Sequence, residues 1–277
     1  MNPMAGAAAS TQPARAPKST RKTLRAVVEY DGTDFCGLQY QPQLRSVAGE
    51  LERALSQILS EPVKIAAAGR TDAGVHATGQ VISFSTERDF PFERLTPALN
   101  SNLPHDISVR EVSVVENAFS ARFSARERTY RYLILNRPAP CALLRRYAYH
   151  VYRPLDLVRF EKAAGELIGE HDFRSFCGVV PQSGSTVRTL HALCARRSNE
   201  LVSVEIRADG FLHRMVRVIV GTLIEIAAGQ RTTQDIVEIL SARDRGASGH
   251  TAPPQGLYLA GVRYLDFDSF SEPRLPA

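Results

Sequence analysis

Residues 68–77 read Ala68-Gly69-Arg70-Thr71-Asp72-Ala73-Gly74-Val75-His76-Ala77 and separate two apolar runs, 63–68 and 80–84. The second run alternates between apolar and polar residues, which is typical of a half-buried strand. The stretch places a cation, a carboxylate and an imidazole in one glycine-rich loop. A loop mounted between two strands can hold such groups rigidly enough for catalysis. From these residues alone, Arg70 and Asp72 could equally form a solvated pair in a surface turn.

Composition limits the class of protein. The chain has 277 residues, 44% of them hydrophobic, which is enough for one large or two medium domains with a sizeable core. No apolar run approaches the ~20 residues that span a bilayer, so we expect no membrane partner. The four cysteines are scattered without a C-x-x-C pair. This distribution argues against a zinc ribbon or a disulfide scaffold and favours a cytoplasmic protein.

The net charge of +5 is unevenly placed along the chain. Residues 1–22 are basic, rich in Ala and Pro and free of an apolar secretion signal, so we predict a disordered basic tail. Residues 120–150 hold seven arginines and one acid, Glu127, interleaved with Phe and Tyr. Arginines among aromatic residues suit phosphate contact and base stacking, although a solvated basic face remains open as an alternative.

Hydrophobic periodicity predicts an α+β fold with helices on one face of the sheet. In the first part we expect strands at 24–30, 80–84 and 107–115, a helix capped by Ser46 and a short helix at 97–103. A boundary is predicted near 116–125. Beyond it we expect a helix at 155–168, a hairpin of strands 189–197 and 201–207, an apolar helix at 212–228 and a closing strand at 257–267. The predicted domains are 23–118 and 119–270, with a short tail at 271–277.

Seven blocks of sequence resemble the bacterial tRNA pseudouridine synthase A family. The most specific is Gly-Arg-Thr-Asp-Ala-Gly-Val-His-Ala at 69–77. The others lie at 30–33, 98–107, 121–132, 169–176, 209–217 and 251–259, so the resemblance covers nearly the whole chain from about 24 to 265. The sequence departs from the family pattern at Leu38, Arg214 and Val218, where the family usually or often has Trp, His and Asn.

The resemblance implies a pseudouridine synthase fold of two domains, each an antiparallel sheet with helices on one face. It also implies a homodimer with a basic cleft that binds tRNA. The implied activity is that of a tRNA-processing isomerase, which converts uridine to pseudouridine at positions 38, 39 and 40 of the anticodon arm. The family uses no metal and no organic cofactor, and we expect none here.

The same resemblance assigns roles to individual residues. Asp72 matches the catalytic aspartate, Arg217 its basic partner, and Tyr130 an active-site tyrosine whose ring can stack on uracil. Arg70 matches the residue that helps displace the target base. We expect further RNA contacts from four arginines, Arg122, Arg126, Arg128 and Arg214. Whether Asp72 adds to the base, attacks the anomeric carbon or removes the ribose 2′ proton stays open.

Two other functions are considered. A non-catalytic RNA-binding module or RNA chaperone would keep the basic surface without the reaction, but the Asp72, Tyr130 and Arg217 set disfavours it. A hydrolase using Asp72 as phosphoryl acceptor would need a carboxylate cluster for Mg²⁺, which the sequence around Asp72 lacks. His76 is predicted to be structural. His171 and Asp172 are too isolated to suggest a metal site.

Overall fold

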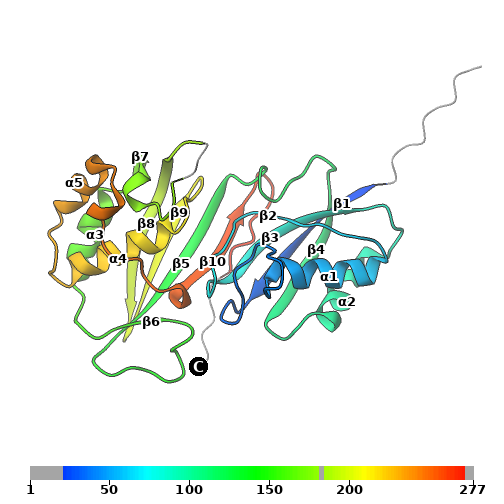
Figure 1. Ribbon diagram of the computed structural model, residues 1–277, viewed down its shortest axis with the longest axis horizontal. Helices are drawn as coiled ribbons and strands as arrows, with labels where there is room; N and C mark the ends of the chain where they lie inside the picture. Colours follow the sequence, from blue (N-terminus) through cyan, green and yellow to red (C-terminus); the bar gives the residue numbers. More distant parts are fainter. Residues whose placement is uncertain (1–20, 181–183, 272–277) are drawn as a thin grey trace, which may run out of the picture.

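The computed structural model describes residues 21–180 and 184–271 and contains one ten-stranded sheet with the order β4-β1-β3-β10-β5-β9-β8-β7 (Figure 1). In addition, β2 pairs with β3 and β6 pairs with β5. The strands are β1 Lys22–Tyr30, β2 Ala66–Ala67, β3 His76–Thr86, β4 Ile107–Val115, β5 Glu127–Asn136, β6 Tyr149–Val151, β7 Gly169–Asp172, β8 Val187–Ser198, β9 Leu201–Ala208 and β10 Leu257–Arg263. The α-helices are α1 Val47–Leu59, α2 Leu95–Asn102, α3 Leu157–Gly165, α4 Met215–Ala227 and α5 Asp235–Ala242.

The N-terminal half, β1 to β4 with α1 and α2, follows the predicted pattern. β1 pairs antiparallel with β3 on one side and with β4 on the other. α1 begins after Ser46, whose Oγ accepts a hydrogen bond from the Gly49 amide at 3.2 Å, as the cap prediction required. Leu51 and Leu55 are fully buried on the face that the sequence periodicity predicted.

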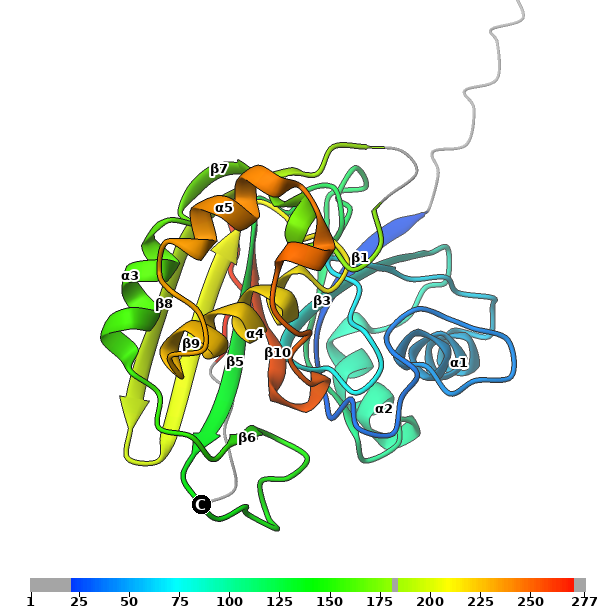
Figure 2. The same cartoon turned by 60° about the vertical axis from the view of Figure 1, so that its left-hand side comes forward.

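The C-terminal half, β5 to β9 with α3, α4 and α5, contains the predicted hairpin of β8 and β9. α4 is apolar around most of its surface and correspondingly buried, and Figure 2 shows it lying across β9 and β5. It begins at Met215, three residues later than predicted. The reason is that Arg214 adopts a left-handed conformation with φ 59°, which a helix cannot continue.

β10 joins the two halves into one sheet. Its residue Tyr258 pairs in parallel with His76 of β3, while Leu259 pairs antiparallel with Tyr130 of β5. A Cβ at Gly79 would lie 2.3 Å from the Ala260 carbonyl oxygen, so only glycine allows this close approach of β3 and β10. The fold class is confirmed, but the two antiparallel halves share a continuous sheet, and its central strand comes from the end of the chain.

Two further predictions concern the tails at the ends of the chain and the lack of a membrane-spanning segment. Lys22, the last residue of the predicted N-terminal tail, starts β1. Residues 1–20 and 272–277, which make up most of both predicted tails, lie outside the described residues. In the part of the chain that the structure describes, no helix has the length and apolar character needed to cross a membrane.

The two faces of β5 have different surroundings. Tyr130 and Tyr132 point into the main core on the face that the helices cover. Thr129 and Arg131 alternate with them and point the other way, where they help to line an open polar hollow of about 720 Å³. The hollow therefore lies on the opposite face of the sheet from Tyr130.

Candidate active site

The loop at 68–75 is held in place by side chains of the neighbouring strands. The hydroxyls of Tyr30 and Thr71 are 2.8 Å apart, and burial raises the pKa of Tyr30 to about 12, which keeps that hydroxyl neutral. The Gln80 amide group donates to the Gly69 carbonyl at 2.8 Å and accepts from the Gly69 amide at 3.3 Å. The Leu38 amide donates to the Thr71 carbonyl at 3.1 Å. These contacts fix the backbone on both sides of Asp72.

Asp72 meets Arg217 at the centre of the molecule. Arg217 Nη1 donates to Asp72 Oδ2 at 2.8 Å, although 145 residues separate them. Their side chains are 27% and 12% exposed, so the pair is accessible from one side. Arg217 Nε also donates to the Ala252 carbonyl at 2.7 Å, which fixes the plane of the guanidinium. The structure therefore brings together the two residues that the sequence predicted as partners.

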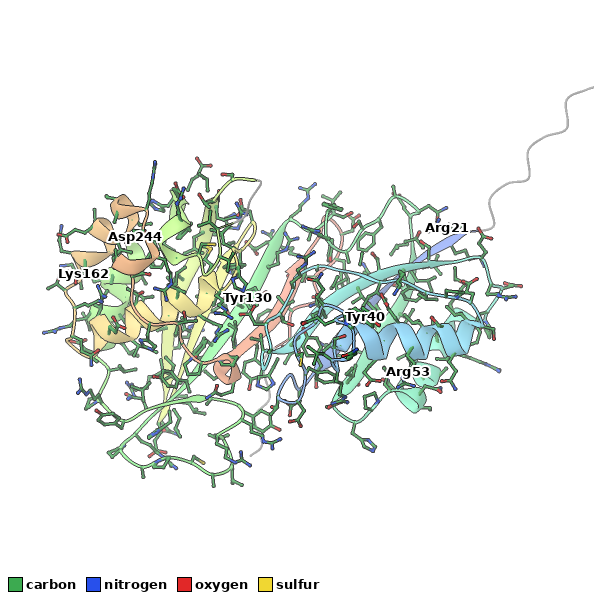
Figure 3. The ribbon with its side chains drawn as sticks, viewed as in Figure 1. Arg21, Tyr40, Arg53, Tyr130, Lys162 and Asp244 are labelled. Atoms are coloured by element: carbon green, nitrogen blue, oxygen red, sulfur yellow. The ribbon has the colours of Figure 1, made fainter. Side chains whose placement is uncertain are left out.

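Figure 3 shows Tyr130 on β5 in the region where the two halves meet, and its hydroxyl is close enough to Asp72 to be influenced by the charge of that residue. Its ring is buried and meets Phe211 edge-on at 5.0 Å. Burial, reinforced by Tyr30 and the negative charge of Asp72, raises the pKa of Tyr130 well above its usual value. The hydroxyl therefore stays protonated near neutral pH, where it can donate a hydrogen bond but is a poor proton acceptor.

Arg128 was expected to contact RNA, but its hydrogen bonds point inward. Its guanidinium donates to the carbonyls of Ala68, Arg122 and Asp209, the last two at 2.7 Å. Burial lowers the pKa of Arg128. Because backbone carbonyls occupy its donors, Arg128 is better placed to hold three loops together than to bind a phosphate. The expected contact of Arg128 with RNA stays a prediction.

The other predicted RNA contacts are exposed: Arg70, Arg122, Arg126 and Arg214. Arg122 lies over the ring of Phe123 at 5.2 Å, and that ring is 80% exposed. A guanidinium beside an open aromatic face can bind a phosphate and stack on a base. Arg70 precedes Asp72 by two residues and Arg214 precedes Arg217 by three, so the surface around the pair is basic.

His213 is a site residue that the sequence analysis did not single out. Its Nε2 lies 3.8 Å from Asp72 Oδ1, and its side chain is 39% exposed. The signal was present, because His213 precedes Arg217 by four residues within the block at 209–217, a spacing that places two side chains near each other on a helix. The sequence pattern does not show the left-handed turn at Arg214, which places His213 before the start of α4.

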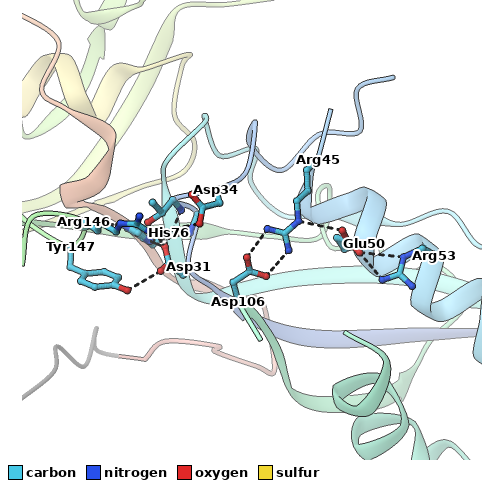
Figure 4. Close-up of polar contacts among 11 residues, drawn as sticks. Asp31, Asp34, Arg45, Glu50, Arg53, His76, Asp106, Arg146 and Tyr147 are labelled. Atoms are coloured by element: carbon cyan, nitrogen blue, oxygen red, sulfur yellow. Dashed lines mark hydrogen bonds and ion pairs between the residues drawn. The ribbon is translucent and has the colours of Figure 1, made fainter. Parts of the chain in front are cut away.

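His76 has a structural position, as expected. Its side chain is 2% exposed and stacks on Tyr258 with the ring centroids 4.8 Å apart. Figure 4 shows it beside Asp31 and Tyr147, between the two halves. His76 Nε2 lies 3.0 Å from the Arg146 carbonyl, and Tyr147 donates to Asp31 Oδ2 at 2.9 Å. Burial opposes the ionisation of Asp31, but contacts with His76, Thr33 and Tyr147 hold its pKa well below the usual range.

Three remaining sequence features are structural. Leu38 and Val218, two departures from the family pattern, are 3% and 0% exposed in the core, so they affect packing. Asp172 caps a short turn through its contact with the Arg174 amide. Within residues 21–180 and 184–271, no group of three His, Cys, Asp or Glu side chains could hold a metal ion.

Comparisons with known proteins agree with this geometry. The sequence model of the tRNA pseudouridine synthase family matches residues 26–124 and 163–265. A tRNA pseudouridine synthase A from Brevibacillus brevis is 45% identical over 243 residues, covering 88% of this chain and 100% of that protein. Its namesake from Halalkalibacterium halodurans is 46% identical over 237 residues, covering 85% and 90%. The one from Caulobacter vibrioides is 45% identical over 243 residues, covering 87% and 98%.

Proposed function

The chain belongs to the tRNA pseudouridine synthase family, and we propose that it isomerises uridine to pseudouridine at positions 38, 39 and 40 of the tRNA anticodon arm. The observation that carries this proposal is the partly exposed Asp72–Arg217 pair, formed by two segments that are 145 residues apart in the chain. The reaction exchanges an N1 for a C5 glycosidic bond. No electrons or groups enter or leave overall, so the chemistry itself requires no redox cofactor.

Asp72 is the proposed nucleophile or base. Arg217 donates to Oδ2, and the Asp72 side chain is 27% exposed, so an extruded uridine can reach the carboxylate. The hydrogen bond from Arg217 fixes the position of the carboxylate, which either role needs. Tyr130 contributes an aromatic ring and a neutral hydroxyl beside the target base.

The exposed arginines Arg70, Arg122, Arg126 and Arg214 are the proposed tRNA contacts. They come from three segments of the chain and can neutralise phosphates of the bound tRNA. Arg70, two residues from Asp72, is placed to displace the target base. The family resemblance further supports a homodimer, and the scattered cysteines support a cytoplasmic location.

The experiment that tests the function is mapping of pseudouridine at single-nucleotide resolution in an unmodified tRNA transcript incubated with the purified protein. We expect pseudouridine at positions 38, 39 and 40 with wild type and none with Asp72→Asn. Modification outside the anticodon arm would contradict the proposed target. tRNA binding without any product would favour an RNA chaperone. Light scattering on the same preparation would test the homodimer against the 30.5 kDa monomer.

A further inference from the structure

The two oxygens of Asp72 have different surroundings. Oδ2 accepts the hydrogen bond from Arg217, whereas Oδ1 accepts none from the residues that the structure describes. His213 Nε2 stands 3.8 Å from Oδ1. A reacting atom can sit about 3 Å from both Oδ1 and Nε2, which is the geometry expected of two groups that act on one substrate.

His213 is firmly mounted but open to water. Its carbonyl accepts a hydrogen bond from the Gly178 amide at 2.8 Å. A Cβ added at Gly178 would lie 3.0 Å from His213 Nδ1, so glycine leaves just enough room for the imidazole. The left-handed turn at Arg214 separates His213 from the start of α4 and aims it at the loop that carries Asp72. Because the side chain is 39% exposed, a proton taken up there can pass to solvent.

The reaction needs a base after the uracil has turned. When C5 has joined C1′, C5 still carries its hydrogen and N1 is doubly bonded to C6. To reach pseudouridine, the C5–H bond breaks, its electron pair forms the C5–C6 double bond, and N1 takes a proton. Tyr130, buried with a neutral hydroxyl, is a poor acceptor for the C5 proton.

We propose that His213 is the catalytic base that accepts the C5 proton of the reattached uracil through Nε2. N1 takes its proton from water, and His213 later returns its own to water, so protons and electrons balance. The proposal rests on the assignment of Asp72 as the reacting carboxylate. Imidazole suits this task because it is the side chain that most often serves as a general base in enzymes.

The test compares single-turnover rates on tRNA carrying ordinary uridine or uridine deuterated at C5. The variants are His213→Gln, which removes the base but keeps the bulk, and His213→Ala, which leaves space for free imidazole. His105→Gln, at an exposed position outside the site, is the matched control. Asp72→Asn is measured in parallel, and tRNA affinity is measured for every variant.

We expect His213→Gln to slow turnover by about 10²-fold or more, the range for loss of a general base, with tRNA affinity within a few-fold of wild type. Its residual rate should show a deuterium isotope effect at least as large as that of wild type. Added imidazole should restore part of the rate of His213→Ala but none of that of His213→Gln. His105→Gln should match wild type.

Two results would overturn the proposal: near-normal rates for both His213 variants, or slow turnover without an isotope effect, which would make His213 an RNA contact. If Asp72→Asn is inactive in the same assay, such a failure belongs to His213 alone. Full activity of Asp72→Asn would instead remove the site assignment on which the proposal rests.

Discussion

Asp72 and Asp31 are both partly exposed carboxylates that connect the two halves of the sheet, with side chains 27% and 31% exposed. Their carboxylate oxygens differ in their hydrogen-bond partners. Asp31 accepts from the Thr33 amide at 2.9 Å and from the Tyr147 hydroxyl at 2.9 Å, and His76 lies against it. Asp72 accepts from Arg217 on one oxygen and keeps the other available for a substrate.

The difference separates a structural carboxylate from a reactive one. The hydrogen-bond donors around Asp31 stabilise its ionised form and lower its pKa. They also leave no position on the carboxylate free for a substrate. Asp72 has a single strong partner and an open oxygen at the exposed edge. The same contrast holds for two arginines: the donors of Arg128 go to backbone carbonyls, whereas the side chain of Arg122 is exposed.

The largest expected effect is on Asp72. Replacing it with Asn keeps the shape but removes the charge, so the single-turnover rate should fall on the order of 10³-fold or more. tRNA affinity should stay within a few-fold, because phosphate contacts dominate binding. Asp31→Asn is the matched variant and should keep most of the rate. Comparable losses of rate in both variants would break the distinction between the two carboxylates.

Arg217 gives the next effect. Arg217→Ala removes the cation that holds Oδ2, and the single-turnover rate should fall by about 10²-fold or more. Arg217→Lys should recover part of the rate, since a charge remains but the fork that reaches both Asp72 and the Ala252 carbonyl is lost. A change confined to tRNA affinity would show that Arg217 contacts phosphate and does not assist Asp72.

The third prediction is that replacing Asp31 changes the stability of the folded protein. Because its pKa is lower in the folded protein than the value of about 3.9 in an unfolded chain, its contribution is complete above about pH 4 and is lost as the pH falls further. Asp31→Asn should lower the free energy of unfolding by about 1 kcal/mol at pH 7, allowing for solvent screening. Urea titrations at several pH values should show this difference shrinking below pH 4.

The control for that titration is Asp34→Asn, since the Asp34 side chain is 67% exposed and pairs with Arg146 at 3.6 Å. Its effect on stability should be close to zero at every pH. A difference for Asp31→Asn that grows as the pH falls would have the wrong sign for a carboxylate with a lowered pKa.

The smallest effects distinguish the two arginines. Arg122→Ala should reduce the slope of log affinity for tRNA against log salt by about 0.7 to 0.9, the value for one phosphate contact. Arg128→Ala should lower the melting temperature, because it leaves the backbone carbonyls of Ala68, Arg122 and Asp209 without this donor. The control is Arg53→Ala, on the exposed side of α1. It should change neither the salt dependence of tRNA affinity nor the melting temperature. Equal salt slopes for wild type and Arg122→Ala would remove Arg122 from the RNA contacts.

Local sequence determined the elements of this protein. The strand at 107–115 was predicted with the bounds that β4 has, and the hairpin of β8 and β9 was placed within two residues at each end. The Ser46 cap was also correct. These features depend on alternation, periodicity and side-chain caps, which act over a few residues and can therefore be read from the chain. The role of Asp72 was predicted differently, from the family resemblance of the string at 69–77, because the residue types alone left a solvated surface pair open.

Only the tertiary structure decided how distant segments meet. The place of β10 between β3 and β5 depends on the close approach at Gly79, which no local pattern encodes. His213 faces Asp72 because Arg214 turns the chain before α4, and Arg128 serves backbone carbonyls because three loops converge on it. Each of these contacts joins residues far apart in the sequence. Packing of the whole chain decides which residues become their partners. The type of a residue alone therefore could not predict whether its polar group would be hydrogen-bonded within the protein or left free for a substrate.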